Sequence, residues 1–160
     1  MIVVITGKGG QLAWELERLA PKHFQIISVG RDELDVTNEL LVAKFIANIK
    51  PDLVINAAAY TAVDQAEIDS ELAYAVNELG TKYLANACRG ANARMLHVST
   101  DFVFDGTSAV PYKPDCKPNP INVYGASKLA GEFSLQSILP DSSVIVRTAW
   151  VYSVNGNNFV

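Results

Sequence analysis

The sequence predicts an α/β fold, with a doubly wound parallel sheet and helices on both faces. Short β-branched runs alternate along the chain with longer helical stretches, an order typical of such a sheet. The short runs are almost continuously apolar, as expected for strands that are covered on both sides. Five strands are expected, over Ile2–Thr6, Gln25–Val29, Leu53–Asn56, Arg94–Ser99 and Ser143–Arg147.

Apolar residues spaced three and four apart predict the helices between these strands. The three stripes are Leu12, Leu16 and Leu19, then Leu41, Phe45, Ile46 and Ile49, then Leu72, Val76, Leu79 and Leu84. A fourth helix is expected from near Asn122 to Gln136. The run Thr37-Asn38-Glu39 supplies side chains that can cap the second helix.

The stretch from Asp105 to Asn122 interrupts this alternation. Its four prolines, Pro111, Pro114, Pro118 and Pro120, exclude a regular helix. A long loop is therefore expected between the fourth strand and the fourth helix. That loop would lie at the carboxyl edge of the sheet, where such folds bind ligands.

The composition fits one globular domain over residues 1–160, with 49% apolar and 19% charged residues. The net charge of −4 gives no reason to expect a nucleic-acid partner. No apolar run approaches the roughly 18 residues of a membrane span, and the start has no signal-peptide pattern. We therefore expect a cytoplasmic protein without membrane association, in which Cys88 and Cys116 are free thiols.

A glycine turn, Thr6–Ala13, joins the first strand to the first helix. Gly7 permits the tight turn, and Gly10 lets a pyrophosphate approach the backbone at the helix start. The third small position is Ala13, which still allows close packing of helix and strand. This placement indicates a Rossmann-like dinucleotide site. Both Arg31 and Asp32 follow the second strand, so the residues leave NADP and NAD open; we expect NADPH, with NADH tolerated.

The pair Tyr124 and Lys128 is the most specific signal in the chain. Residues four apart on a helix project from one face. A lysine ammonium near a phenol lowers the tyrosine pKa, which makes the phenol a general acid for a carbonyl oxygen. Thr100 ends the fourth strand and can hydrogen-bond that oxygen. His97, on the same strand, is expected to be a buried structural histidine, and no metal-ligand spacing is present.

These motifs resemble the extended short-chain dehydrogenase/reductases, and among them the dTDP-4-dehydrorhamnose reductases. The resemblance covers nearly the whole chain. Its specific stretches are residues 7–12, 34–37, 56–64, 99–106, 124–132 and 147–152.

The resemblance implies roles for individual residues. Tyr124 would donate the proton, assisted by Lys128 and Thr100. The cofactor would be held by Gly7, Gly10, Gln11, Leu12, Asp35, Val36, Ala59, Tyr60, Thr61 and Lys128, and the sugar nucleotide by Thr100, Asp101 and Trp150. The implied reaction is hydride transfer from NAD(P)H to the 4-keto group of dTDP-4-dehydro-L-rhamnose, giving dTDP-L-rhamnose.

Two departures from the family pattern matter. Phe102 stands where the family often has tyrosine, which removes a hydroxyl beside the substrate. The substrate lobe at the carboxyl side of the family pattern is absent from this chain, and such a lobe normally closes over the sugar. A 4,6-dehydratase is disfavoured because Phe102 replaces the glutamate of its Thr-Asp-Glu run. An epimerase of the same superfamily and a truncated, non-catalytic cofactor-binding module stay as alternatives, and homo-oligomer formation is left open.

Overall fold

The computed structural model describes residues 1–156. Five strands form one parallel sheet in the order β2-β1-β3-β4-β5, a common doubly wound order. The strands are β1 Ile2–Thr6, β2 Gln25–Val29, β3 Leu53–Asn56, β4 Arg94–Thr100 and β5 Ser143–Thr148. The predicted α/β fold is confirmed, and only β4 and β5 extend one residue beyond the predicted ends.

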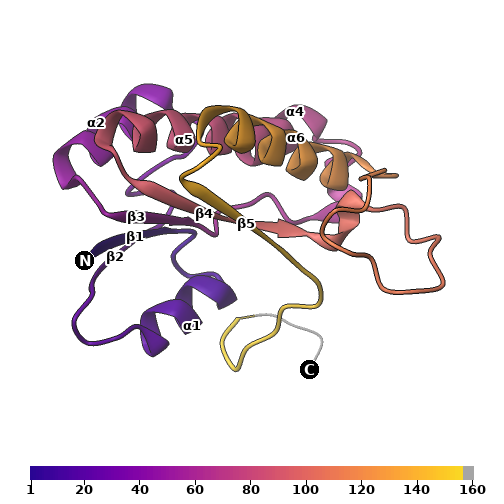
Figure 1. The fold of residues 1–160 in the computed structure, drawn as a ribbon, viewed down its shortest axis with the longest axis horizontal. Helices are drawn as coiled ribbons and strands as arrows, with labels where there is room; N and C mark the ends of the chain where they lie inside the picture. Colours follow the sequence, from indigo (N-terminus) through magenta and orange to yellow (C-terminus); the bar gives the residue numbers. More distant parts are fainter. Residues whose placement is uncertain (157–160) are drawn as a thin grey trace.

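Helices cover both faces of the sheet, but unevenly. The long helices are α1 Gln11–Leu19, α2 Glu39–Ile49, α5 Gly80–Ala91 and α6 Val123–Ile138. Short elements are α3 Val63–Ala66, α4 Ser70–Tyr74, a π-helical segment η1 Ala75–Leu79 and a 3₁₀ turn η2 Asp101–Val103. Figure 1 shows α1 alone on the lower face, while α2, α4, α5 and α6 cover the upper face.

The uneven cover leaves part of the sheet exposed. The larger core lies under α2, α5 and α6, and a smaller core joins Val3 and Ile5 to Ala13 of α1. On β5, Ile145 packs against the larger core, while its neighbours Val144 and Val146 are 58% and 40% exposed. Helices thus lie on both faces of the sheet, as predicted, but the side of β5 that carries Val144 and Val146 is left exposed.

The third predicted stripe is only partly confirmed. Leu84 is buried, but Leu72 and Leu79 are more than a third exposed. The intervening η1 turns the chain by a wider π-helical step, so the apolar spacing of one α-helix does not carry across it. Asn77 faces the interior instead.

Capping side chains begin two of the helices, at Asn38 within the run predicted to cap the second helix and at Asn122, where a helix start but no cap was predicted. The Asn38 side chain accepts a hydrogen bond from the Leu41 amide at 3.0 Å, and Asn122 accepts one from the Gly125 amide at 2.7 Å. Each cap satisfies an amide that has no partner within its own helix.

The proline-containing loop has no regular helix or strand, as predicted. It is organised around the Asp105 carboxylate, which accepts hydrogen bonds from the Tyr112 hydroxyl at 2.7 Å and the Asn119 amide at 2.9 Å. The backbone amide and the hydroxyl of Thr107 also donate to Asp105. The Arg147 guanidinium donates to the Pro114 carbonyl at 3.2 Å and so ties the loop to β5.

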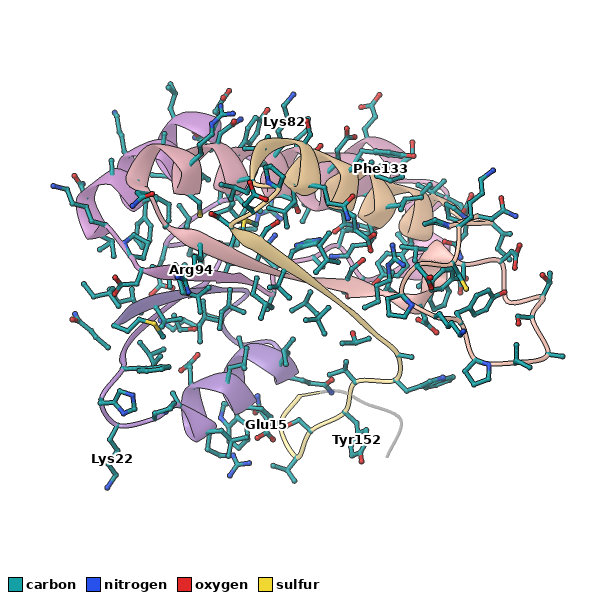
Figure 2. The ribbon with its side chains drawn as sticks, viewed as in Figure 1. Glu15, Lys22, Lys82, Arg94, Phe133 and Tyr152 are labelled. Carbon is teal, nitrogen blue, oxygen red and sulfur yellow. The ribbon has the colours of Figure 1, made fainter. Side chains whose placement is uncertain are left out.

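After β5 the chain returns towards α1. Figure 2 shows Tyr152 of this returning segment on the same side of the molecule as Glu15 of α1. The Ser153 hydroxyl donates to the Glu15 carboxylate at 2.7 Å. This contact holds the segment after β5 beside the carboxyl edge of the sheet.

Candidate active site

A cavity of about 520 Å³ lies at the carboxyl ends of β1, β3, β4 and β5. It includes the point between β1 and β3 where the strand order reverses, the usual ligand site of a doubly wound sheet. Most of the predicted site residues line it: Gly7, Gly10, Gln11, Leu12, Ala59, Thr61, Thr100, Asp101, Tyr124, Lys128 and Trp150. Tertiary structure thus brings the glycine turn and the Tyr124–Lys128 pair to one cavity.

The glycine turn has the geometry that a phosphate site needs. Gly7 has φ +83°, and a Cβ on it would lie 2.8 Å from the Ala57 backbone, so this position requires glycine. Gly10 begins α1 without any capping side chain, and no acidic residue stands in the first helical turn. The amides at this helix start therefore favour an anion, and the turn fits a dinucleotide pyrophosphate.

Tyr124 stands at the start of α6, where close packing fixes the helix. A Cβ on the next residue, Gly125, would lie 2.1 Å from the Phe102 carbonyl oxygen, so only glycine allows this approach. The Phe102 ring packs edge-on against the Tyr124 ring at 5.5 Å between centroids. Phe102, the residue that departs from the family pattern, therefore helps to form the wall around the phenol.

The electrostatics of Tyr124 differ from the sequence prediction. Burial raises the pKa of Tyr124 above its ordinary value; a hydrogen bond with Thr100 opposes this and the charge of Asp101 adds to it. The predicted lowering by Lys128 is not seen. The Lys128 Nζ donates instead to the Val98 carbonyl at 2.7 Å, and burial lowers the pKa of this lysine to about 8.

Thr100 and Asp101 lie together beside the phenol. The Thr100 hydroxyl donates to the Asp101 carboxylate at 3.1 Å and accepts from the Phe102 amide at 3.2 Å. Thr100 thereby caps η2, which places Asp101 at the cavity wall. Trp150 follows β5, has φ +53° and is 76% exposed at the rim of the cavity.

Three predicted cofactor residues do not line the cavity. The Tyr60 phenol donates to Asp69 at 3.1 Å. The Asp35 carboxylate accepts from the amide and the hydroxyl of Thr37 at 2.9 and 2.7 Å. Val36 is buried against Gly80, where an added Cβ would lie 3.0 Å from its side chain.

Several buried polar residues near the site were missed by the sequence analysis. Asn77 of η1 exchanges two hydrogen bonds with the Tyr60 backbone and donates to the Ser127 hydroxyl at 3.0 Å. The Glu132 carboxylate is 1% exposed and pairs with the Arg147 guanidinium at 2.6 Å. A polar residue on the buried face of a helix is the sequence signal that could have identified Asn77 and Glu132.

His97 is buried, as predicted, and both of its ring nitrogens have polar neighbours. Its two ring nitrogens lie 3.1 Å from the Asn56 amide nitrogen and 3.3 Å from the Lys128 Nζ. This contact with Lys128 joins His97 to the wall of the cavity.

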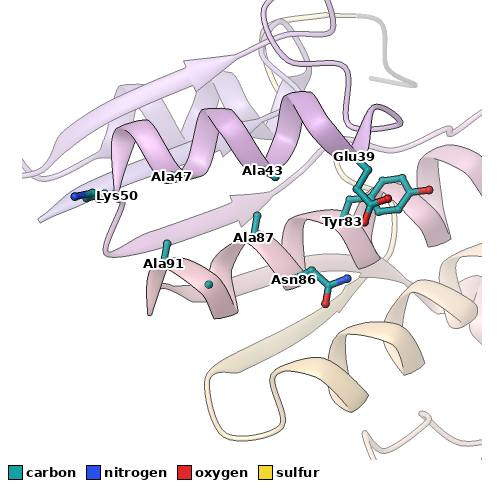
Figure 3. Close-up of a pocket in the computed structure, with 9 residues that line it drawn as sticks. Glu39, Ala43, Ala47, Lys50, Tyr83, Asn86, Ala87 and Ala91 are labelled. Atoms are coloured by element: carbon teal, nitrogen blue, oxygen red, sulfur yellow. The ribbon is translucent and has the colours of Figure 1, made fainter.

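A second depression, of about 500 Å³, lies between α2 and α5 on the outer face of the helices (Figure 3). Its walls are mainly the small side chains of Ala43, Ala47, Ala87 and Ala91, and none of the predicted site residues lines it. It offers no general acid or base near a phosphate-binding turn, so the cavity at the strand ends is the candidate active site.

Three further observations concern the described residues. Within residues 1–156, no cluster of acidic, histidine and cysteine side chains is placed to hold a metal ion. No helix in the same range is long and apolar enough to cross a membrane. Cys88 and Cys116 are both free, as predicted.

Comparison with known proteins agrees with the resemblance inferred from the sequence. The chain is 44% identical over 160 residues to a dTDP-4-dehydrorhamnose reductase of Sinorhizobium fredii, matching all of this chain and 54% of that protein. It superimposes on a crystal structure of such a reductase from Clostridium acetobutylicum with a TM-score of 0.96 and 43% identity, over 99% of this chain and 56% of that one. For the Bacillus anthracis reductase in complex with NADP, the TM-score is 0.95 and the identity 41%, with coverage of 99% and 56%.

The chain spans about half the length of the curated relatives that it matches. The family model described as the RmlD substrate binding domain matches residues 1–160. Because that match covers the whole sequence, the chain belongs to the RmlD substrate binding domain family.

Proposed function

We propose that this chain is the cofactor-binding part of an NADPH-dependent reductase that acts on the 4-keto group of dTDP-4-dehydro-L-rhamnose. The observation that carries the proposal is that the Tyr124 phenol, Thr100 and Lys128 line the same cavity as the glycine turn. Similarity to dTDP-4-dehydrorhamnose reductases, one of them in complex with NADP, supports the choice of reaction and cofactor.

The residues have distinct roles in this proposal. NADPH would supply the hydride that the carbonyl carbon receives. Gly7, Gly10, Gln11 and Leu12 would hold the pyrophosphate, and Ala59 and Thr61 would line the rest of the cofactor site. Arg31, whose side chain is 75% exposed and lies 3.8 Å from the Asp35 carboxylate, would pair with the extra phosphate of NADP. The other predicted cofactor residues are Asp35, Val36 and Tyr60, and they would contact the cofactor outside this cavity.

The proton transfer is assigned to Tyr124. Its hydroxyl would donate a proton to the carbonyl oxygen, so that hydride on carbon and proton on oxygen together give the alcohol. Thr100 would hold the phenol, while Asp101 and Trp150 would contact the sugar nucleotide at the cavity wall and rim. A substrate lobe outside residues 1–160 would exclude water from the sugar. Cytoplasmic location and homo-oligomer formation stay predictions.

Two measurements test the proposal together. NADPH binding to the chain, followed by the fluorescence of the cofactor, tests the turn and cavity without any substrate. NADPH consumption with dTDP-4-dehydro-L-rhamnose tests the reaction. Tyr124→Phe should abolish turnover and leave NADPH affinity within about threefold, because only the phenol oxygen is removed.

Tyr83→Phe is the matched control, since Tyr83 loses the same atom in the groove between α2 and α5 (Figure 3). Unchanged turnover in Tyr124→Phe, or equal loss in both variants, would contradict the assigned role. The alternatives give other outcomes: an epimerase would convert a sugar nucleotide without net NADPH consumption, and a cofactor-binding module would bind NADPH without any turnover.

A further inference from the structure

A chain of buried polar side chains runs beneath the cavity from β1 to α6. It consists of Thr6, Asn56, His97 and Lys128, all 5% exposed or less. The Thr6 hydroxyl donates to the Asn56 Oδ1 at 2.7 Å. The Asn56 Nδ2 lies 3.1 Å from the His97 Nδ1, and the His97 Nε2 lies 3.3 Å from the Lys128 Nζ.

The orientation of the Asn56 amide is fixed by its two threonine neighbours. The Thr6 Oγ1 accepts from the Ala58 amide at 3.2 Å, so its own hydrogen is directed to the Asn56 Oδ1. On the other side, the Thr81 hydroxyl donates to the Asn77 carbonyl at 2.8 Å and accepts from the Asn56 Nδ2 at 3.2 Å. Turning the amide over would leave the Thr6 hydrogen without an acceptor in a buried site, which is costly.

This orientation determines where His97 carries its proton. The Asn56 Nδ2 is a donor only, so the His97 Nδ1 has to accept from it. Burial of the ring, the larger cause, lowers the pKa of His97 well below its ordinary value whether or not Lys128 is charged, so the ring is neutral. A neutral imidazole has one N–H, and it is therefore on Nε2, directed at the Lys128 Nζ.

A lysine ammonium has three donors and no acceptor, so it cannot accept this hydrogen, whereas the neutral amine can. The amine form accepts from the His97 Nε2 and still donates to the Val98 carbonyl at 2.7 Å. We infer that His97 is a positioning residue for the proposed reaction, which stabilises the neutral amine form of Lys128 through a hydrogen bond from Nε2 to Nζ.

Burial and the neighbouring charges also act on Lys128. Glu132, one turn further along α6, favours the ammonium, but its carboxylate is held by the Arg147 guanidinium and the Ser99 hydroxyl. On the cavity side, Lys128 shares its wall with Tyr124 and Asp101. The pKa of Lys128, lowered to about 8 by burial, lets both forms occur near neutral pH.

The consequence for catalysis rests on the proposed function, in which Lys128 assists Tyr124 as the family resemblance implies. Loss of the lysine charge on raising the pH would remove that assistance. The alkaline limb of kcat/KM would then follow the titration of Lys128, and His97 would determine its position.

Nitrogen-15 NMR of the histidine rings tests the bond directly in the intact protein. The His97 Nε2 should be protonated and its Nδ1 unprotonated in the wild type. Asn56→Asp presents only acceptors, so in that variant the Nδ1 should carry a proton. Thr81→Val is the matched control: it also removes a partner of Asn56 but leaves Thr6 to fix the amide, so its spectrum should match the wild type. A protonated Nδ1 in the wild type would overturn the inference, whether or not the variants fold.

The titration of Lys128, followed through its Cε resonance in carbon-13-labelled protein, gives the second test. The midpoint of this titration should lie well below the ordinary lysine value of 10.5 in the wild type. In Asn56→Asp it should be higher by at least about one pH unit. In a His97→Leu background, Asn56→Asp should no longer shift it; a shift of equal size there would assign the effect to the added charge and refute the bond. Neither NMR measurement involves NADPH or a sugar, so failure of the proposed reaction would not be confused with failure of this inference.

Discussion

Gly131→Ala is expected to destabilise the protein strongly, although alanine favours helices. A Cβ at Gly131 of α6 would lie 2.3 Å from the Asn77 carbonyl oxygen and 3.3 Å from the Thr81 hydroxyl. Asn77 lies in η1 and Thr81 at the start of α5, and both elements pack against α6. Helix α6 would therefore have to move outwards by roughly 1 Å. Overpacking of this kind costs about 1–3 kcal/mol or more, against about 1 kcal/mol gained in helix propensity. Because the obstructing atom is a backbone oxygen, the cost should lie at or above the upper end of this range, at about 3–4 kcal/mol, which leaves a net loss of about 2–3 kcal/mol.

Thermal unfolding followed by circular dichroism measures this loss. In a chain of this size, about 2–3 kcal/mol lowers Tm by roughly 4–12 °C. Gly90→Ala is the matched control, because Gly90 lies in α5 and a Cβ there meets nothing within 4 Å. It should raise Tm by roughly 2–4 °C through helix propensity alone. Replacing glycine by alanine should therefore lower Tm at position 131 and raise it at position 90. A Gly131→Ala protein as stable as the wild type would refute the packing argument.

Three further predictions concern charge and burial. Arg147→Met leaves the Glu132 carboxylate buried without its cation, so urea unfolding should show a loss of about 3–5 kcal/mol, and a loss below 1 kcal/mol would contradict the buried ion pair. Hydrogen bonds, first that from Asn119, lower the pKa of Asp105 below its ordinary value of 3.8, so its contribution to stability is present above about pH 4 and disappears as the pH falls further. Asp105→Asn should therefore lower the urea midpoint at pH 7 and lower it progressively less as the pH falls from about 4 towards 2; an equal effect at pH 7 and pH 2 would be inconsistent with this linkage. Burial raises the pKa of Cys88 to about 12, so a thiol reagent at pH 8 should modify Cys116 alone in the folded protein and both thiols in urea; fast labelling of Cys88 in the folded protein would show that it is accessible.

The fold could be predicted from local pattern because each strand and most helices are specified by short-range signals. The β-branched runs gave all five strands, and Asn38 and Asn122 are capping residues that begin their helices. The prediction failed at Leu72 and Leu79, where the π-helical segment changes the helical phase. A π-helical turn has no clear local sequence pattern, because it is stabilised by what packs against it. Here that is the close approach of Gly131 of α6.

The site was predicted to the same extent and for a similar reason. The glycine turn and the spacing of Tyr124 and Lys128 are local patterns, and the strand order brings both to one cavity. The direction of the Lys128 side chain could not be predicted from local sequence pattern. Whether its Nζ supports the phenol or faces His97 and Val98 depends on β4, about 30 residues earlier in the chain.

The sequence by itself determined the parallel α/β sheet, the glycine turn, the proline-containing loop and the candidate side chains for the proposed reaction, because each depends on the chemistry of neighbouring residues. Only the tertiary structure decided which buried polar groups meet. Thr6, Asn56, His97 and Lys128 are separated by 31 to 50 positions from one to the next, and they are joined by the pairing of β1, β3 and β4 and the packing of α6 above them. The protonation of Lys128 depends on that arrangement, since hydrogen bonds and burial, rather than residue type, set a buried pKa.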